Sequence, residues 1–153
     1  GSSNYPKGPG VRSETTYDWT DTTTSGYCRN QRWQQLRDEY YGDIDVELAK
    51  VMEADHYDTL LGIWNASGRT ICGHGEVEPE WDYDPSGAYD GKVTSSNLAY
   101  PNLGMWGRWG HPCGTPFIVD DFLAAHPEYA WQLPYLHDLP SNDWTLFNKA
   151  GPI

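Results

Sequence analysis

Two short pairs of cysteine and histidine are the side chains of this sequence best suited to chemistry. Cys72 and His74 are two positions apart, and so are His111 and Cys113. In an extended strand, alternation would put Cys72 and His74 on one face, as ligands of zinc would need. Structural zinc sites usually have wider ligand spacing, and a Cys72–Cys113 disulfide or two buried thiols fit the pattern as well. We predict no metal and no other cofactor, and Cys72 with Cys113 as the candidate disulfide.

Other polar groups fit chemistry less well. Asp55, His56 and Asp58 could serve in acid–base catalysis, but mixed charges at a helix end are usually a solvated terminus. The acidic residues within 76–84 lack the spacing of a known calcium loop and are interpreted as a solvated segment. Cys28, the third cysteine, lies beside Arg29 and could be a reactive thiol or pair with a partner chain, but we expect it to be buried and inert. None of these groups is predicted to form a site.

The elements that would position these side chains begin with helices. Apolar residues recur at helical spacing from Arg29, and Gly42 is placed to end that helix. Asp45 is a plausible N-cap for a second helix that runs to about Ala54. The stretch 4–26, rich in Thr, Ser, Gly and Pro, is expected to be extended chain and loops.

Strands are expected to follow the two helices. Residues 70–77 and 91–99 are predicted strands that could pair, and 105–114 is predicted to be a loop rich in Gly and Trp. Residues 119–125 are predicted to be helical, and 143–147 is predicted to be a terminal apolar anchor. Helices, then strands, then a helical or irregular tail favour an α+β fold, with residues 1–153 as a single segment.

Composition limits the classes of partner. Asp and Glu number 22 against 10 Lys and Arg, so the net charge of -12 repels phosphate backbones and anionic membranes. We therefore expect no nucleic acid partner, and no apolar run reaches the ~20 residues of a transmembrane segment. The beginning of the chain lacks the pattern of a signal peptide, so the sequence is interpreted as mature, processed or truncated. Asn65 begins an Asn-Ala-Ser sequon and is a candidate glycosylation site.

Several segments carry a family resemblance in shared order. They are 3–6 (Ser-Asn-Tyr-Pro), 17–19 (Tyr-Asp-Trp), 29–31 (Arg-Asn-Gln), 45–58, 78–79 (Glu-Pro), 90–95 (Asp-Gly-Lys-Val-Thr-Ser) and 143–147 (Asp-Trp-Thr-Leu-Phe). Together they resemble the C-terminal region of the phospholipase B-like proteins, which are related to the isopenicillin N acyltransferase-like and choloylglycine hydrolase-like amidases. The resemblance implies the C-terminal part of a four-layer αββα sandwich of the N-terminal-nucleophile hydrolases.

The resemblance also implies an activity that this chain cannot carry alone. The family's nucleophile is a Cys exposed by autoproteolytic processing, so an upstream chain of the same precursor would have to supply it. Asn4 would then donate to the oxyanion, and Arg29 would stabilise the thiolate or hold a substrate carboxylate. The expected reaction is hydrolysis of linear amide or lipid acyl bonds, in a secreted or lysosomal (vacuolar) glycoprotein.

An alternative function needs no catalysis. Eight Trp and 11 Tyr make the chain rich in aromatic residues. A secreted glycan-binding or structural module could use the faces of Trp106, Trp109 and Trp131, and burial of all three would remove that surface.

Overall fold

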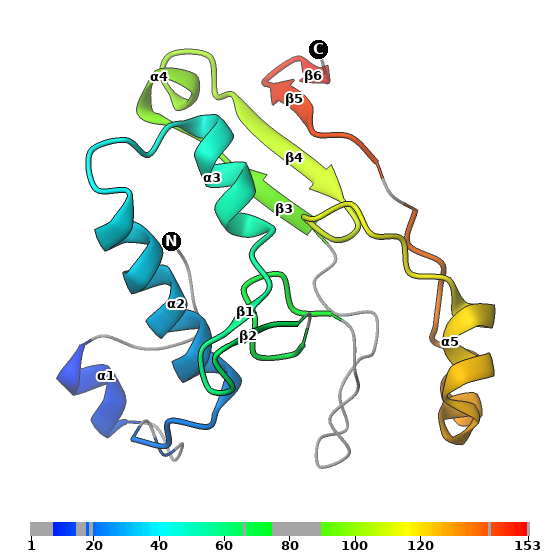
Figure 1. The fold of residues 1–153 in the computed structure, drawn as a ribbon. Coiled ribbons are helices and arrows are strands. Elements are labelled where there is room, and N and C mark those ends of the chain that lie inside the picture. Colours follow the sequence, from blue (N-terminus) through cyan, green and yellow to red (C-terminus); the bar gives the residue numbers. More distant parts are fainter. Residues whose placement is uncertain are drawn as a thin grey trace.

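The chain forms a mixed α+β fold, as expected (Figure 1). The computed structural model describes residues 8–14, 18, 20–65, 67–74, 90–140 and 142–152. Its helices are α1 (Pro9–Ser13), α2 (Ser25–Glu39), α3 (Val46–Glu53), α4 (Ser96–Ala99), α5 (Val119–Ala125) and the 3-10 helix η1 (Pro127–Gln132). Its strands are β1 (Tyr57–Asp58), β2 (Ile63–Trp64), β3 (Asp90–Val93), β4 (Met105–Trp109), β5 (Thr145–Asn148) and β6 (Gly151–Pro152).

The strands form two antiparallel sheets. β3, β4, β5 and β6 pair in that order in a four-stranded sheet, and β1 pairs with β2 in a two-stranded ribbon. α3 packs beside β3 (Figure 1). Gly91 in β3 is needed for close packing, because a Cβ there would lie 2.5 Å from the Trp144 ring. The four-stranded sheet and α3 thus pack together as one layer, which lies above the β1–β2 ribbon in the view of Figure 1.

Both long helices begin where local sequence signals place them. Thr24 caps α2 by accepting a hydrogen bond from the Tyr27 N–H, and Asp45 caps α3 by accepting one from the Leu48 N–H. The predicted helices from Arg29 and from Asp45 are therefore confirmed, although α2 starts a turn earlier than expected. Among the described residues, none of the helices has the length and apolar character needed to cross a membrane.

Several predicted elements are wrong. Residues 70–72 bend and residues 73–74 are irregular, so no strand forms there, and residues 75–89 lie outside the described ranges. The predicted strand 91–99 is only partly extended, because Ser95 caps the short helix α4 after β3 ends. The predicted loop 105–114 contains β4, the strand between β3 and β5. Within the predicted extended stretch 4–26, residues 9–13 form α1.

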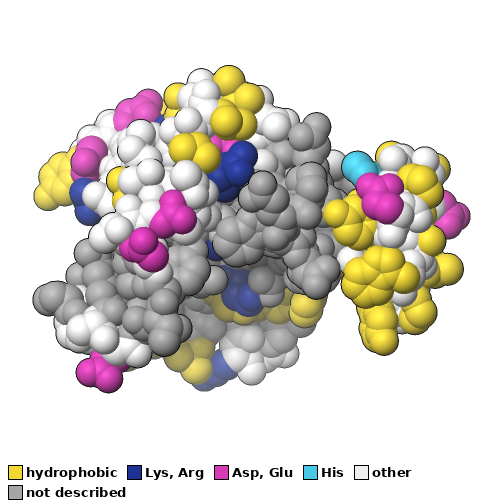
Figure 2. Space-filling model, turned by 90° about the horizontal axis from the view of Figure 1, so that it is seen from below, with side chains coloured by type: hydrophobic (Ala, Val, Ile, Leu, Met, Phe, Trp, Pro, Cys, Tyr) yellow, Lys and Arg dark blue, Asp and Glu magenta, His cyan; other side chains and the backbone are white. Residues whose placement is uncertain are grey.

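The C-terminal third contains a separate apolar cluster, formed by residues 117–139 and called here the α5 lobe. Phe117, Val119 and Leu136 are buried together, with Phe122, Leu123 and Leu139 packed around them. Phe117 and Leu139 close the lobe through a backbone bridge. The lobe projects beside the rest of the molecule, and hydrophobic side chains gather on the face seen in Figure 2. The prediction of a helix at 119–125 is confirmed by α5.

Candidate metal centre

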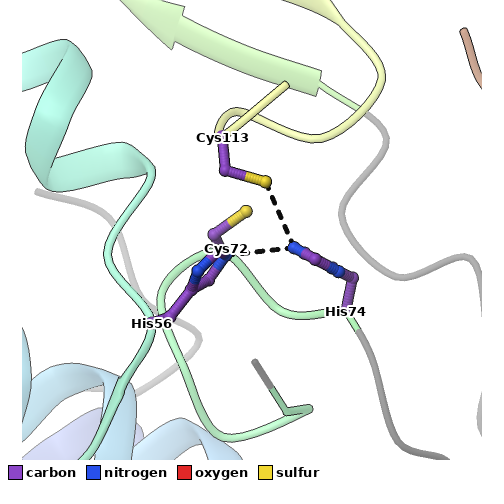
Figure 3. A group of neighbouring side chains, drawn as sticks. All are labelled: His56, Cys72, His74 and Cys113. Carbon is purple, nitrogen blue, oxygen red and sulfur yellow. Dashed lines mark hydrogen bonds between the residues drawn. The ribbon is translucent and has the colours of Figure 1, made fainter. Parts of the chain in front are cut away.

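Four potential metal ligands converge below the sheet: His56, Cys72, His74 and Cys113 (Figure 3). One ligand atom from each lies within 4.8 Å of all the others. His56 follows α3, Cys72 and His74 share one loop, and Cys113 comes from the loop after β4. We call these four side chains the metal cluster.

The spacing inside the metal cluster suits a tetrahedral ion. His74 Nε2 lies 3.0 Å from His56 Nε2 and 3.2 Å from Cys113 Sγ. Zinc bonds of about 2.0–2.1 Å to nitrogen and about 2.3 Å to sulfur would place ligand atoms roughly 3.3–3.8 Å apart. Small side-chain shifts would therefore admit an ion at the centre. Two sulfurs and two imidazoles are a donor set typical of structural zinc.

His56 is positioned by the end of α3 and by a buried ion pair. Asp55, next to it, accepts hydrogen bonds from the Arg32 guanidinium at 2.8–3.1 Å and from the Tyr57 N–H at 2.9 Å. The Asn65 N–H donates to the His56 carbonyl at 2.9 Å. The backbone on either side of the His56 ring is thus fixed before any ion binds.

The loop that carries Cys72 and His74 is fixed to the same backbone. The Cys72 N–H donates to the Asp55 carbonyl at 3.0 Å, which directly joins the two ligand-bearing segments. The Thr70 hydroxyl contacts the carbonyls of Ser67 and Cys72 at 2.8 and 2.9 Å, and Thr70 and Cys72 are both fully buried. This loop is therefore held by polar groups instead of by a β-ladder.

Asp58 organises the turn beneath that loop. Its carboxylate is fully buried and accepts hydrogen bonds from the N–H groups of Leu60 and Leu61, from the Ser67 hydroxyl and from Arg69 Nε. Burial alone would raise the pKa of Asp58. Its effect is outweighed by the hydrogen bond from the Leu61 N–H, the hydrogen bond and charge of Arg69, and the hydrogen bond from the Leu60 N–H. The net effect lowers the pKa, so the ionised carboxylate is the stabilised form.

Cys113 lies in a turn bounded by Gly110 and Gly114, both at positive φ. A Cβ at Gly110 would lie 2.6 Å from the Pro140 carbonyl oxygen, so glycine is required there. The Thr115 N–H donates to Cys113 Sγ at 3.4 Å. The sulfur is thus aimed at His74 by its own loop.

His111 supports the cluster from outside. Its ring stacks on that of His74, with centroids 4.1 Å apart and an interplanar angle of 8°. Nδ1 lies 2.8 Å from the Thr115 carbonyl, so this nitrogen carries the proton. The ring is buried and orients His74 without being one of the four converging ligands.

The two cysteines of the cluster share a proton unequally. Their mutual hydrogen bond holds the pKa of the Cys113 thiol far below its usual range, with help from His56, His74 and Thr115 against the opposing effect of burial. The same hydrogen bond, and then burial, raises the pKa of Cys72. The thiolate form is therefore favoured at Cys113 over Cys72, and zinc binding through both sulfurs would release protons from these thiols.

The structure revises the interpretation of the Cys and His pairs. Cys72 and Cys113 do come together, but Cys28, Cys72 and Cys113 are all free thiols, so the candidate disulfide is not formed. The fourth member of the cluster is His56, a residue that the Cys and His spacing did not mark as a ligand. His111, considered in its place, stacks against the cluster instead. The donor set gives a reason to revise the expectation of no metal.

The predicted catalytic pair stays a prediction, because only Arg29 falls within the described residues. Asn4 lies outside them. The Arg29 guanidinium donates to the carbonyl and hydroxyl oxygens of Ser25, one turn back on α2. Asn65 is exposed at the end of β2, and its glycosylation stays a prediction. The acidic run 76–84 also falls outside the described ranges.

Comparisons with known proteins name no relative. No protein-family model matches the chain, and no curated protein or solved structure matches it. The phospholipase B-like resemblance therefore stays a prediction, and the metal cluster must be interpreted from its own geometry.

Proposed function

We propose that this chain is a zinc-binding domain in which one ion, held by the metal cluster, ties three separate segments together. The observation that carries the proposal is the convergence of two imidazole nitrogens and two sulfurs within 4.8 Å. His56 would connect the end of α3, Cys72 and His74 the central loop, and Cys113 the loop after β4. A site with four protein ligands is closed, which favours a structural role over a catalytic one.

The size of the apolar core supports this role. Within the described residues, the only buried apolar cluster belongs to the α5 lobe, whereas the region around the metal cluster buries mainly polar groups. A bound ion stabilises a fold that binds it only in the native state, so it can replace missing hydrophobic burial.

Metal content and cobalt spectroscopy test the proposal directly. Protein purified under reducing conditions should bind one equivalent of zinc, and cobalt substitution should give the thiolate charge-transfer and tetrahedral d–d bands of a two-sulfur, two-nitrogen site. Loss of a group that only orients a metal ligand typically costs about 10- to 100-fold in metal affinity, so loss of a ligand itself in Cys72→Ser or His56→Ala should cost more. Folded protein that binds no zinc or cobalt would overturn the proposal.

Matched control variants are available in the same chain. Cys28→Ser removes a buried thiol of α2 whose Sγ lies 3.5 Å from the Thr22 carbonyl. His137→Ala removes an exposed imidazole of the α5 lobe. Both should bind zinc as the unmodified chain does. Equal losses in controls and ligand variants would indicate general destabilisation rather than ligand removal.

A second candidate function is thiol chemistry at Cys113. Its sulfur is 3.2 Å from His74 Nε2, is only partly buried, and has a lowered pKa. A cavity of about 320 Å³ borders His74 and His111 and extends to Phe117 and Phe122. Rapid, selective alkylation of Cys113 in protein that does not bind zinc would favour this function. Protection of Cys113 by zinc would favour the structural ion.

The hydrolase chain implied by the family resemblance stays a separate prediction. It requires an upstream chain with an N-terminal Cys, completion of the four-layer sandwich, and a secreted or lysosomal location. Asn4→Ala and Arg29→Ala should then abolish turnover of an amide or lipid acyl substrate in the assembled protein. Full activity of both variants would reject these roles.

The alternative function, a glycan-binding or structural module, retains two of the three Trp faces that it would use. Trp109 and Trp131 are 68% and 61% exposed, whereas Trp106 is half-buried, with Lys50 Nζ 3.5 Å above its ring. The two exposed rings lie on β4 and η1, which are different parts of the fold. Glycan binding by this chain should disappear in Trp109→Ala and Trp131→Ala if this function holds.

A further inference from the structure

We propose that the metal cluster is a redox switch: a peroxide oxidant joins Cys72 to Cys113 as a disulfide and so expels the zinc ion. This inference rests on the proposed zinc site and adds its regulation. The reduced protein would hold the ion through both sulfurs. The oxidised protein would keep the same two segments joined by a covalent bond instead.

Three features of the site carry the inference. The two sulfurs lie within 4.8 Å of each other, and a disulfide requires about 2.05 Å, so their approach needs a movement of about 3 Å or less. Cys113 is partly exposed, whereas Cys72 is fully buried. An oxidant therefore reaches Cys113 first, and Cys72 stands beside it as the resolving thiol.

The loop of Cys113 is the more exposed of the two, since Cys113 and Gly114 are half-buried and Thr115 is exposed. It follows β4 and is a short turn closed by a hydrogen bond from the Gly114 N–H to the His111 carbonyl at 2.8 Å. Cys72 is instead fixed by hydrogen bonds at both its N–H and its carbonyl. The sulfur of Cys113 would thus travel towards that of Cys72.

The reaction balances with hydrogen peroxide as the only oxidant. Cys113 Sγ, as thiolate, attacks one peroxide oxygen. The O–O bond breaks, and the other oxygen leaves as hydroxide and becomes water after taking a proton from solvent. Cys72 Sγ, also as thiolate, then attacks the sulfenic sulfur, so that the S–S bond forms and the second hydroxide leaves and is protonated to water. Two sulfurs lose two electrons in total and the peroxide gains them.

Zinc release follows from the ligand count. A disulfide sulfur is not a thiolate and is a poor zinc ligand, because binding requires the deprotonated, reduced form. After oxidation only His56 and His74 remain of the four ligands. Two imidazoles on loop segments do not complete a tetrahedral site.

The test uses zinc-loaded, full-length protein in two stages. First, zinc binding is measured in the reduced protein, and failure at this stage counts against the zinc site itself. Second, hydrogen peroxide is added with a chromogenic zinc indicator, and peptides are mapped by mass spectrometry without reduction. We expect loss of all bound zinc, loss of two of the three thiols, and a Cys72–Cys113 linkage that a dithiol reductant and zinc reverse.

The control and the overturning results separate the switch from the site. Cys28→Ser should release zinc as the unmodified chain does, because Cys28 lies on α2 outside the cluster. Zinc that stays bound under peroxide would overturn the switch but leave the zinc site intact. Zinc release with Cys113 found as sulfinic or sulfonic acid, or with Cys28 in the linkage, would also overturn it.

Discussion

The region around the metal cluster and the α5 lobe are held together by different forces. Around the cluster the buried groups are mainly polar: Asp55, Asp58, Thr70 and His74, together with the Cys72 thiol. In the α5 lobe they are apolar and contact one another directly, with Phe117 at the centre. A polar interior is stable only when its groups are paired, whereas an apolar one needs only burial.

Because of this difference, the stability of the two regions should depend on different changes. The polar region should respond to metal, oxidant and loss of a single charge, because each buried group there relies on a specific partner. The lobe should respond chiefly to lost volume. Its exposed apolar side chains include Ile118, Trp131, Leu133 and Tyr135, and they leave its outer face uncovered (Figure 2).

Metal removal should cause the largest loss of stability and the clearest difference between the metal-cluster region and the α5 lobe. At free zinc about 10,000-fold above its dissociation constant, chelation should remove about 5.5 kcal/mol of unfolding free energy. Amide hydrogen exchange should then quicken at residues 55–74 and 105–116. The exchange rates at residues 117–139, in the α5 lobe, should change little. Uniform loss of protection over both regions would show that the lobe is not an independent unit.

Removal of the Asp58 carboxylate should come next. Asp58→Ala leaves Arg69 without this ion pair partner and the N–H groups of Leu60 and Leu61 unpaired, so we expect a loss of about 3–5 kcal/mol. Chemical denaturation at saturating zinc measures it. Because the folded pKa is lowered, the loss should stay constant from pH 7 down to about 3.9, the value for Asp in unfolded chains, and shrink only below it. A loss that shrinks between pH 7 and 5 would contradict the lowered pKa.

Truncation in the lobe should have a somewhat smaller and local effect. Phe117→Ala should cost about 3 kcal/mol, since Phe117 is buried among Val119, Leu136 and Phe122. Hydrogen exchange should quicken within 117–139, and the zinc affinity should stay within about twofold. Ile118→Ala, at the exposed neighbouring position, is the matched control and should change little. A large drop in zinc affinity would mean that the lobe supports the cluster.

The smallest effect is expected at the surface of α2. Asp38→Ala removes the ion pair with Arg37, whose members are 68% and 55% exposed, and should cost less than about 1 kcal/mol. This variant is the control for Asp58→Ala, because both remove an Asp paired with an Arg. Equal losses in the two variants would remove the distinction between buried and exposed charge on which the comparison relies.

The sequence predicted helices α2, α3 and α5 but not α1 or α4, and of the strands it predicted only β3, within 91–99. Asp45 and the apolar spacing after it place α3, and the predicted helix 119–125 has the same bounds as α5. β4 was missed because Gly107 and Gly110 make its sequence look like a loop, although Phe147 of β5 packs against Gly107 in the sheet. Residues 70–74 look like a strand, but hydrogen bonds of the Thr70 hydroxyl and the Asp58 carboxylate hold this segment as a bent loop.

The sequence by itself determined the caps and faces of the helices, the acidic surface, and which side chains are able to bind zinc. Those properties depend on residues a few positions apart. Only the tertiary structure decided that His56 and not His111 completes the cluster, since His74 meets partners 18 and 39 positions away in the chain. Backbone hydrogen bonds such as that between Cys72 and Asp55 bring these loops together, and because every residue offers the same backbone groups, the side-chain pattern does not mark where they form.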